Sequence, residues 1–356
     1  MRGWFRLPFL ILLFGAAWMT AQSAQANGVD DAKAGEIAKV RGRDEEAIRL
    51  FTRALRSGEL STNNQAVTLD NRATVYAHKR QFDLAIADFN ESIRLRPNAV
   101  VYRNRALTYS KMHRYDQAVA DFDAAIRLKP EFSSAYRERG AVHGLKHEYE
   151  KAIADFTHAI RLNPNDADAY HFRGVARSRS GQYDQALNDY REAIRLKPDF
   201  PEAYWSRGFH YFVLDKLSQA EQDFEWASKL GSSDAYKWLW LHVVRGKLGH
   251  AEGDELKAST SKLDLVKWPG PVVALYTGQG SIEKIRTAAS NGDAYTVHDR
   301  GCEADFFIAE YEMARKHSAE ATSLLQHVVS SCQDTLSAIG AAAELKRLQK
   351  KTTASG

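Results

Sequence analysis

The sequence is dominated by a segment that recurs every 33 or 34 residues. Pro97, Pro130, Pro164 and Pro198 each close an Ile-Arg-Leu-X-Pro string. Each copy contains two apolar stripes at helical spacing, separated by a short polar turn, which predicts a pair of antiparallel helices. The proline that follows the second helix prevents this helix from continuing. Such a tandem array predicts an all-α solenoid, in which stacked helix hairpins bury a continuous core.

Side-chain size is also fixed at particular positions of the period. Counted within each copy of the repeat, position 4 holds a large residue, namely Leu69, Tyr102, Tyr136, Tyr170 and Tyr204. Position 8 holds a small residue, namely Ala73, Ala106, Gly140, Gly174 and Gly208. Position 20 holds alanine, namely Ala85, Ala118, Ala152, Ala186 and Ala220. The pattern resembles the tetratricopeptide repeat (TPR) family. The resemblance implies a right-handed superhelix of antiparallel hairpins, whose first helices line a concave binding groove.

The predicted organisation follows the strength of the repeat. Residues 27–61 resemble a degenerate N-terminal repeat, 62–232 hold five strong repeats, and 233–349 hold degenerate helical repeats. A capping helix is expected near residues 335–349, followed by a disordered tail at 350–356.

Residues 1–26 have the pattern of an export signal. Arg2 and Arg6 precede an apolar run that is too short to span a bilayer, and Ala24 and Ala26 supply the small residues of a cleavage site. We expect cleavage after Ala26 and a periplasmic or secreted protein without stable membrane insertion; an uncleaved membrane anchor is the alternative. No lipid-acceptor cysteine lies near the cleavage point.

Charged residues recur with the repeat as well. Position 7 is arginine and position 23 is aspartate in all five strong copies, namely Arg72, Arg105, Arg139, Arg173 and Arg207, and Asp88, Asp121, Asp155, Asp189 and Asp223. Both positions become apolar together in the first and last repeats. This shared change predicts partly buried ion pairs, either within a hairpin or between adjacent hairpins.

The family's groove positions predict a partner-binding surface. It comprises Arg103, Leu107, Lys111, Arg137, His171, Val175, Arg179, Trp205, Phe209 and Phe212. The helix that carries the last three is apolar on both faces, so it must be covered or present a binding patch. The chain's own C-terminal helices, a peptide ligand and a dimer contact are the three alternatives for what covers it.

Other side chains narrow the class of protein. The only cysteines, Cys302 and Cys332, are expected at the same end of the last hairpin, where they would form a disulfide or remain two buried thiols. A net charge of +4 among 356 residues is too small for a nucleic-acid-binding field. His143 and His147 give only a weak metal signal, and no catalytic motif occurs. We therefore expect no metal, no cofactor and no enzyme activity.

The C-terminal third carries a second resemblance. Trp-Pro-Gly-Pro at 268–271, Cys-Glu-Ala at 302–304 and Ala-Glu-Leu-Lys-Arg-Leu at 343–348 resemble bacterial envelope TPR lipoproteins, a family that includes adaptors for peptidoglycan hydrolases. Together the patterns predict an extracytoplasmic scaffold that binds cell-envelope proteins or peptides through its groove. A receptor for a small, muropeptide-like ligand and a structural homodimer subunit are the alternatives.

Overall fold

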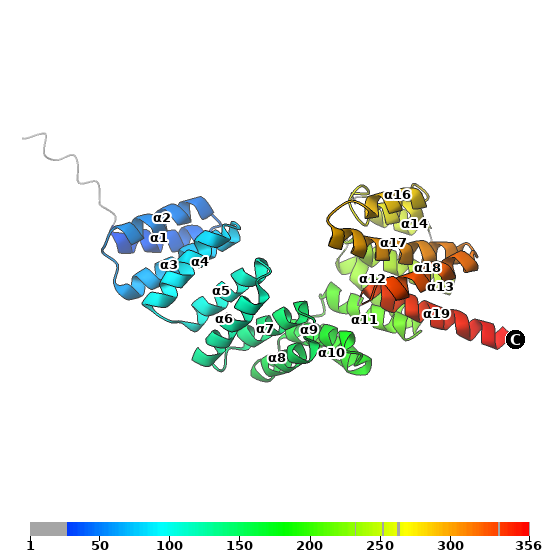
Figure 1. Ribbon diagram of the computed structural model, residues 1–356, viewed down its shortest axis with the longest axis horizontal. Coiled ribbons are helices and arrows are strands. Elements are labelled where there is room, and N and C mark those ends of the chain that lie inside the picture. The colour runs from blue at the N-terminus through cyan, green and yellow to red at the C-terminus, as the bar shows by residue number, and fades with distance from the viewer. Residues whose placement is uncertain (1–26, 232, 251–252, 262–263, 334, 356) are drawn as a thin grey trace, which may run out of the picture. The chain divides into compact units, whose positions relative to one another are not determined.

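The computed structural model describes residues 27–355, except 232, 251–252, 262–263 and 334. The predicted signal peptide, residues 1–26, therefore lies outside the described residues. Every regular element in the described ranges is a helix (Figure 1). Within the same ranges, no helix is both long enough and apolar enough to cross a membrane.

The chain divides into two compact units, one ending at Glu138 and one beginning at Arg139. A single continuous array was expected from the sequence. Division of such an array is physically reasonable because each repeat contacts only its neighbours along the chain. The boundary falls inside α7 (Ser133–Leu145).

The first unit consists of helix hairpins. They are formed by α1 (Gly28–Val40) with α2 (Asp44–Arg56), α3 (Thr62–His78) with α4 (Phe82–Leu95), and α5 (Ala99–Lys111) with α6 (Tyr115–Leu128). Phe51, Phe89 and Phe122 are almost completely buried between the helices. The degenerate copy at 27–61 thus folds as a hairpin like the strong copies.

The second unit begins with the same hairpins and continues into shorter helices. It comprises α8 (Tyr149–Leu162), α9 (Ala167–Arg179), α10 (Tyr183–Leu196), α11 (Pro201–Val213), α12 (Leu217–Leu230), α13 (Ala235–Leu248), α14 (Gly253–Thr260), α15 (Gly270–Tyr276), α16 (Ile282–Ala289), α17 (Ala294–Ala314), α18 (Ser318–Ser331) and α19 (Leu336–Ser355). Gly174 shows why position 8 must be small, because a Cβ there would lie 2.7 Å from the ring of Tyr190.

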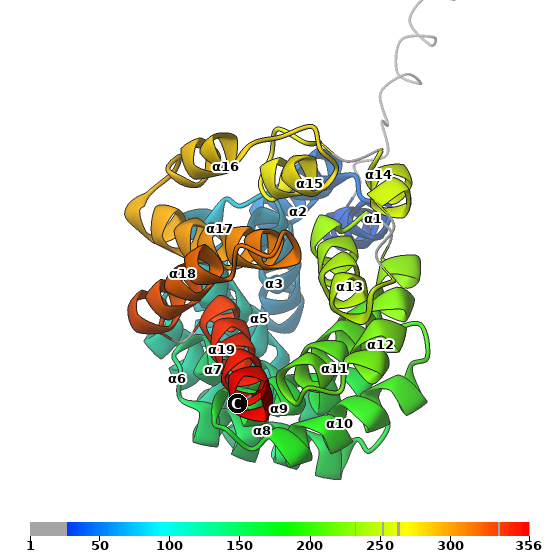
Figure 2. The ribbon, with the colours of Figure 1, turned by 90° about the vertical axis from the view of Figure 1, so that its right-hand side faces the viewer.

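The last helix begins where it was predicted but continues further toward the C-terminus. It begins at Leu336 and continues to Ser355, so the expected disordered tail at 350–356 is wrong as far as Ser355. The sequence offers a reason, since no glycine or proline lies between Ala341 and Ser355. Figure 2 shows α19 between α11 and α18, both of which it contacts.

The repeated arginines and aspartates pair within hairpins. In all five strong repeats the guanidinium donates to both carboxylate oxygens of the aspartate 16 residues further on, over 2.6 to 3.3 Å. In the last of these pairs, the side chains of Arg207 and Asp223 are 19% and 5% exposed. Burial raises the pKa of Asp223, and its bonds to Arg207 only partly offset this effect. Each pair therefore joins the two helices of one hairpin at their packing face.

We expect the Arg207–Asp223 pair to behave as one unit in a double-mutant cycle. Arg207→Ala and Asp223→Ala should each destabilise the fold, and the double variant should lose about 1 to 3 kcal/mol less than the sum of the two. The exposed pair Arg195–Glu192, with side chains 64% and 43% exposed, should show coupling below about 1 kcal/mol. Urea unfolding measures both cycles. Additive effects at Arg207 and Asp223 would contradict the pairing.

Candidate functional site

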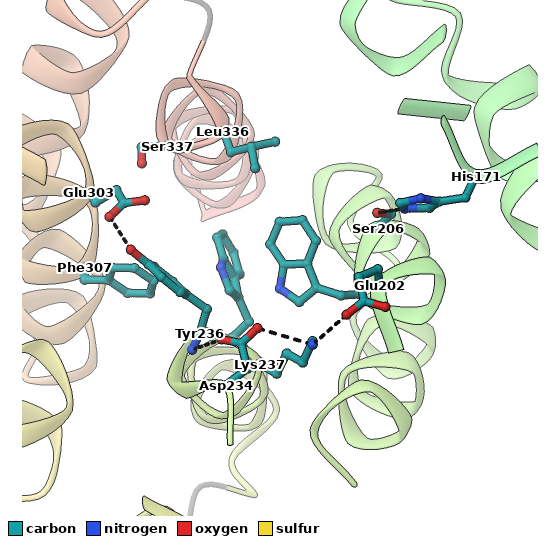
Figure 3. A pocket seen from close by; sticks show the side chains of 12 residues that line it. His171, Glu202, Ser206, Asp234, Tyr236, Lys237, Glu303, Phe307, Leu336 and Ser337 are labelled. Atoms are coloured by element: carbon teal, nitrogen blue, oxygen red, sulfur yellow. Dashed lines mark hydrogen bonds and ion pairs between the residues drawn. The ribbon is translucent and has the colours of Figure 1, made fainter. Parts of the chain in front are cut away.

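A pocket of about 430 Å³ opens among the helices of the second unit. Its lining comes from α9, α11, α13, α17 and α19, and comprises His171, Glu202, Trp205, Ser206, Asp234, Tyr236, Lys237, Trp240, Glu303, Phe307, Leu336 and Ser337 (Figure 3). The first helices of successive hairpins, α9, α11 and α13, form one side. The C-terminal helices α17 and α19 form the other. The volume lies within the range of sites that bind small molecules or side chains of a partner.

Only two of the predicted groove residues, His171 and Trp205, line this pocket. Phe209 and Phe212 do not belong to an open groove, because both are at most 1% exposed. They pack against Trp240, with ring centroids 5.2 Å from it in each case. Their prediction as partner-binding residues is therefore wrong. The chain's own helices α13 and α19 cover this face of α11.

The remaining groove candidates lie elsewhere. Val175 and Arg179 are half-buried on α9 but do not line the pocket. Arg103, Leu107 and Lys111 lie on α5 in the first unit, where Arg103 donates to Glu138 over 2.7 Å. Arg137 lies on α7, just before the unit boundary. These residues stay predicted contacts, and the pocket does not gather them.

His171 is a buried, neutral member of the lining. Its Nε2 lies 3.1 Å from the hydroxyl of Ser206, and the residue is 8% exposed. Burial lowers the pKa of His171 to about 4, despite the opposing effect of nearby Glu202 and Asp168. The imidazole is therefore in its neutral form at pH 7 and contributes no positive charge to the pocket.

The low pKa of His171 makes stability depend on pH. Its folded pKa of about 4 lies below the unfolded value of about 6.5, so the unfolded chain takes up a proton first as the pH falls. The contribution of His171 to the free energy of unfolding is fully present above pH 6.5 and is lost as the pH falls from 6.5 to 4. We expect it to account for about 2 kcal/mol of the loss between pH 7 and pH 5. Urea unfolding of His171→Gln should show that much less loss over the same interval, whereas an equal loss in both proteins would contradict the assignment.

Glu303 is held in a fixed orientation at the pocket wall. Its Oε2 accepts hydrogen bonds from the hydroxyl of Tyr236 and from Nε1 of Trp268, both over 2.7 Å. The two donors are themselves 3.0 Å apart. Burial raises the pKa of Glu303, and the two hydrogen bonds oppose that rise. Figure 3 shows the other carboxylate oxygen directed away from Tyr236 and toward the space inside the lining.

A lysine occupies the opposite end of the pocket. Nζ of Lys237 lies 3.3 Å from Glu202 and 3.2 Å from Asp234, in an arrangement visible in Figure 3. The lysine side chain is only 8% exposed, whereas the two carboxylates are 55% and 40% exposed. Lys237 is therefore already paired with two acids of the lining.

A buried ionic cluster fixes α19 behind the pocket. Nζ of Lys247 lies 2.6 Å from Glu310 and 2.9 Å from Glu344. Arg347 donates to Glu344, to Asp215 and to the backbone carbonyl of Phe212. Burial alone would lower the pKa of Lys247, but the two glutamates raise it above its usual value. The cluster joins α19 to α11, α13 and α17, the helices that carry the lining.

Cys302 and Cys332 form a disulfide, with their Cα atoms 5.8 Å apart. Cys332 follows the end of α18, as expected, but Cys302 lies in the middle of α17 and does not begin that helix. The helix extends further because Asp293 caps it through a hydrogen bond to the amide of Thr296. The bond ties α18 to α17, which carries Glu303 and Phe307.

Two groups of side chains have the residue types of metal ligands. His143 and His147 do not converge, since His143 bonds Glu148 over 2.6 Å and His147 bonds Tyr149 over 2.8 Å. His143 is also buried, with an exposed fraction of 8%. Ligand atoms of Glu312, His317 and Glu320 lie within 4.8 Å of one another. The latter two residues are exposed, and His317 pairs with Glu312, which accounts for this group without a metal.

Most residues of the pocket lie outside the strong repeats and were missed by sequence reasoning. Asp234 caps the N-terminus of α13, Tyr236 and Lys237 lie in α13, and Glu303 lies in α17, all in the part of the chain where the repeat is degenerate. The signals near them were the aromatic run around Trp238 and Trp240 and the Cys-Glu-Ala motif at 302–304, which contains Glu303. Residues brought together from α9 and α19 are too far apart in the sequence to be associated by spacing.

Comparison with known proteins assigns the repeat. Sequence models of the tetratricopeptide repeat match residues 66–98, 99–132, 135–166 and 156–188, and a TPR repeat model matches 178–215. These matches include the positions whose side-chain sizes recur, except Ala220. Together with the consecutive helix hairpins, they identify tetratricopeptide repeats within residues 66–215. Such repeats generally mediate protein interactions, which supports an interaction scaffold.

Solved structures share this fold at low sequence identity. A tetratricopeptide repeat protein from Parabacteroides merdae is 17% identical, with a TM-score of 0.54, over 71% of this chain and 98% of that one. PilF of Pseudomonas aeruginosa is 13% identical, with a TM-score of 0.51, over 65% and 99%. PilW, a type IV pilus biogenesis factor, is 19% identical, with a TM-score of 0.50, over 55% and 94%. Similarity at this level shows the fold alone.

Proposed function

We propose that this chain is an extracytoplasmic scaffold that receives a segment of a partner protein in the pocket of its second unit. The observation that carries the proposal is the position of the pocket. The first helices α9, α11 and α13 form one side of it, and such helices line the binding groove in TPR proteins. Aromatic side chains, the residues in which interface energy concentrates, face it at Trp205, Tyr236 and Trp240.

The extracytoplasmic location is supported by two independent features. Residues 1–26 have the charge, apolar core and small-residue pattern of an export signal. The Cys302–Cys332 disulfide is of the kind that persists in oxidising compartments. A role as adaptor in cell-envelope maintenance rests on the resemblance of the C-terminal third. Mass spectrometry of the exported protein should find Asn27 as its N-terminal residue; a chain that retains residues 1–26 would contradict cleavage.

Partner binding is tested with immobilised protein, residues 27–356, in solubilised envelope extract. Trp205→Ala removes an aromatic wall of the pocket. Trp226→Ala is the matched control, because Trp226 is 54% exposed on α12 and does not line the pocket. We expect proteins that are retained by the native chain and by Trp226→Ala to be lost from Trp205→Ala. Equal retention by the two variants would place the binding surface elsewhere.

A receptor for a small ligand is the second candidate, and the pocket volume of about 430 Å³ favours it. Tryptophan fluorescence distinguishes the small-ligand receptor from the protein-binding scaffold. Saturable changes on adding muropeptides to the purified protein, abolished by Trp205→Ala, would support the small-ligand receptor. Retention of proteins with no response to muropeptides supports the scaffold.

A further inference from the structure

The pocket combines aromatic walls with unbalanced negative charge. Its lining contains three carboxylates, on Glu202, Asp234 and Glu303, and one ammonium group, on Lys237. When all four groups are ionised, the lining carries a net charge of −2, since His171 is neutral at pH 7. We propose that this pocket binds a basic side chain, lysine or arginine, that the partner protein presents. The inference rests on the proposed function and names the chemistry of the partner.

Glu303 is the group that would contact the cation. Two donors, Tyr236 and Trp268, hold one of its oxygens over 2.7 Å each, so the carboxylate cannot turn freely. The second oxygen points into the pocket (Figure 3), and both of these hydrogen bonds are made to the other oxygen, Oε2. A carboxylate held in place in this way is already oriented for an incoming donor, and a charged hydrogen bond is stronger than a neutral one.

Lys237 does not supply that cation. It is engaged by Glu202 and Asp234 at the other end of the pocket, over 3.3 and 3.2 Å. The positive charge needed beside Glu303 must therefore come from outside the lining. An acidic side chain would meet repulsion from three carboxylates, and an apolar one would desolvate the second oxygen of Glu303 without donating a hydrogen bond to it.

The aromatic walls of the pocket can contact both the methylene stem and the charged end of a basic side chain. Trp205, Tyr236, Trp240 and Phe307 surround the space, and aromatic faces attract ammonium and guanidinium groups. Lysine and arginine also carry apolar methylene stems, which can pack on these rings while the charged end reaches the carboxylate. The same pocket thus satisfies both parts of the side chain.

The test uses peptides of one design that differ at a single position. Blocked pentapeptides Gly-Ala-X-Ala-Gly, with X as arginine, lysine, norleucine or glutamate, are titrated into residues 27–356 by calorimetry. The arginine or lysine peptide should bind at least about tenfold more tightly than the norleucine peptide, and the glutamate peptide most weakly. Equal affinity for norleucine, or no binding by any peptide, would overturn the proposal.

Two pairs of variants assign the effect to the pocket. Glu303→Gln should weaken the basic peptides by about tenfold without weakening norleucine, whereas Glu283→Gln, an equal change of charge on exposed α16, should change nothing. Leu336→Lys places an ammonium group in the lining and should abolish binding of the basic peptides, whereas Leu336→Met should preserve it. Loss of selectivity for basic peptides with continued retention of partner proteins would remove this inference and leave the scaffold function intact.

Discussion

Arg347→Met is expected to destabilise the second unit by about 3 to 5 kcal/mol, because it removes one member of a buried ionic cluster. Arg347 is 9% exposed and lies 4.3 Å from the ring centroid of Phe212. Its guanidinium donates to Glu344, to Asp215 and to the carbonyl of Phe212. Without it, the carbonyl loses a charged donor and Glu344 depends on Lys247 alone. Methionine keeps most of the apolar stem, so the loss reports the charge and its hydrogen bonds.

Tryptophan fluorescence during urea unfolding measures this loss of stability in the second compact unit of the chain. Two of the seven tryptophans, Trp4 and Trp18, precede residue 27, and the other five lie after residue 138. Lys346→Met is the matched control, since Lys346 is exposed on the same helix. It removes the same charge and should change stability by less than about 0.5 kcal/mol. Similar losses in the two variants would show that the cluster does not hold α19.

Reduction of the disulfide should lower the free energy of unfolding by about 3 to 4 kcal/mol. Cys302 and Cys332 close a loop with a sequence separation of 30, and the cross-link restricts the unfolded chain far more than the folded one. Both residues are only 3% exposed, so their bond also lies within the core of the second unit. Urea unfolding with and without dithiothreitol, again followed by tryptophan fluorescence, measures the difference.

The variant Cys302→Ala/Cys332→Ala controls for effects of the reductant itself. Its stability should be the same with and without dithiothreitol, and close to that of the reduced native chain. If the native chain is equally stable in both conditions, the cross-link contributes nothing to the fold. If the variant also loses stability on reduction, dithiothreitol acts elsewhere.

Local patterns were sufficient to predict the repeats. The side-chain sizes seen at Tyr170, Gly174 and Ala186 recur at the same positions of each repeat and identify both helices of a hairpin. Adjacent helices can approach closely only where side chains are small. The arginines and aspartates of the repeats likewise stand 16 residues apart in every strong copy, and the structure pairs them in each of these hairpins. Contacts between neighbouring elements of a periodic chain are encoded in that period.

The candidate site could not be predicted in the same way. Trp205 and Phe209 stand at equivalent groove positions in one helix, yet Trp205 lines the pocket and Phe209 is buried beneath Trp240. The difference arises from α13 and α19, which cover part of α11. Nothing in the spacing of the sequence associates Phe212 with Arg347, which lies 135 residues further along the chain.

The series of helix hairpins follows from the amino-acid sequence alone, since periodic size and charge are local properties that each repeat expresses with its immediate neighbours. Which aromatic side chains face an open pocket and which lie in the core depends on the tertiary structure. It also decided that Glu303, held by Tyr236 and Trp268, faces that pocket. These features depend on how the aperiodic C-terminal helices pack on the repeats, which involves the shapes of many distant side chains at once.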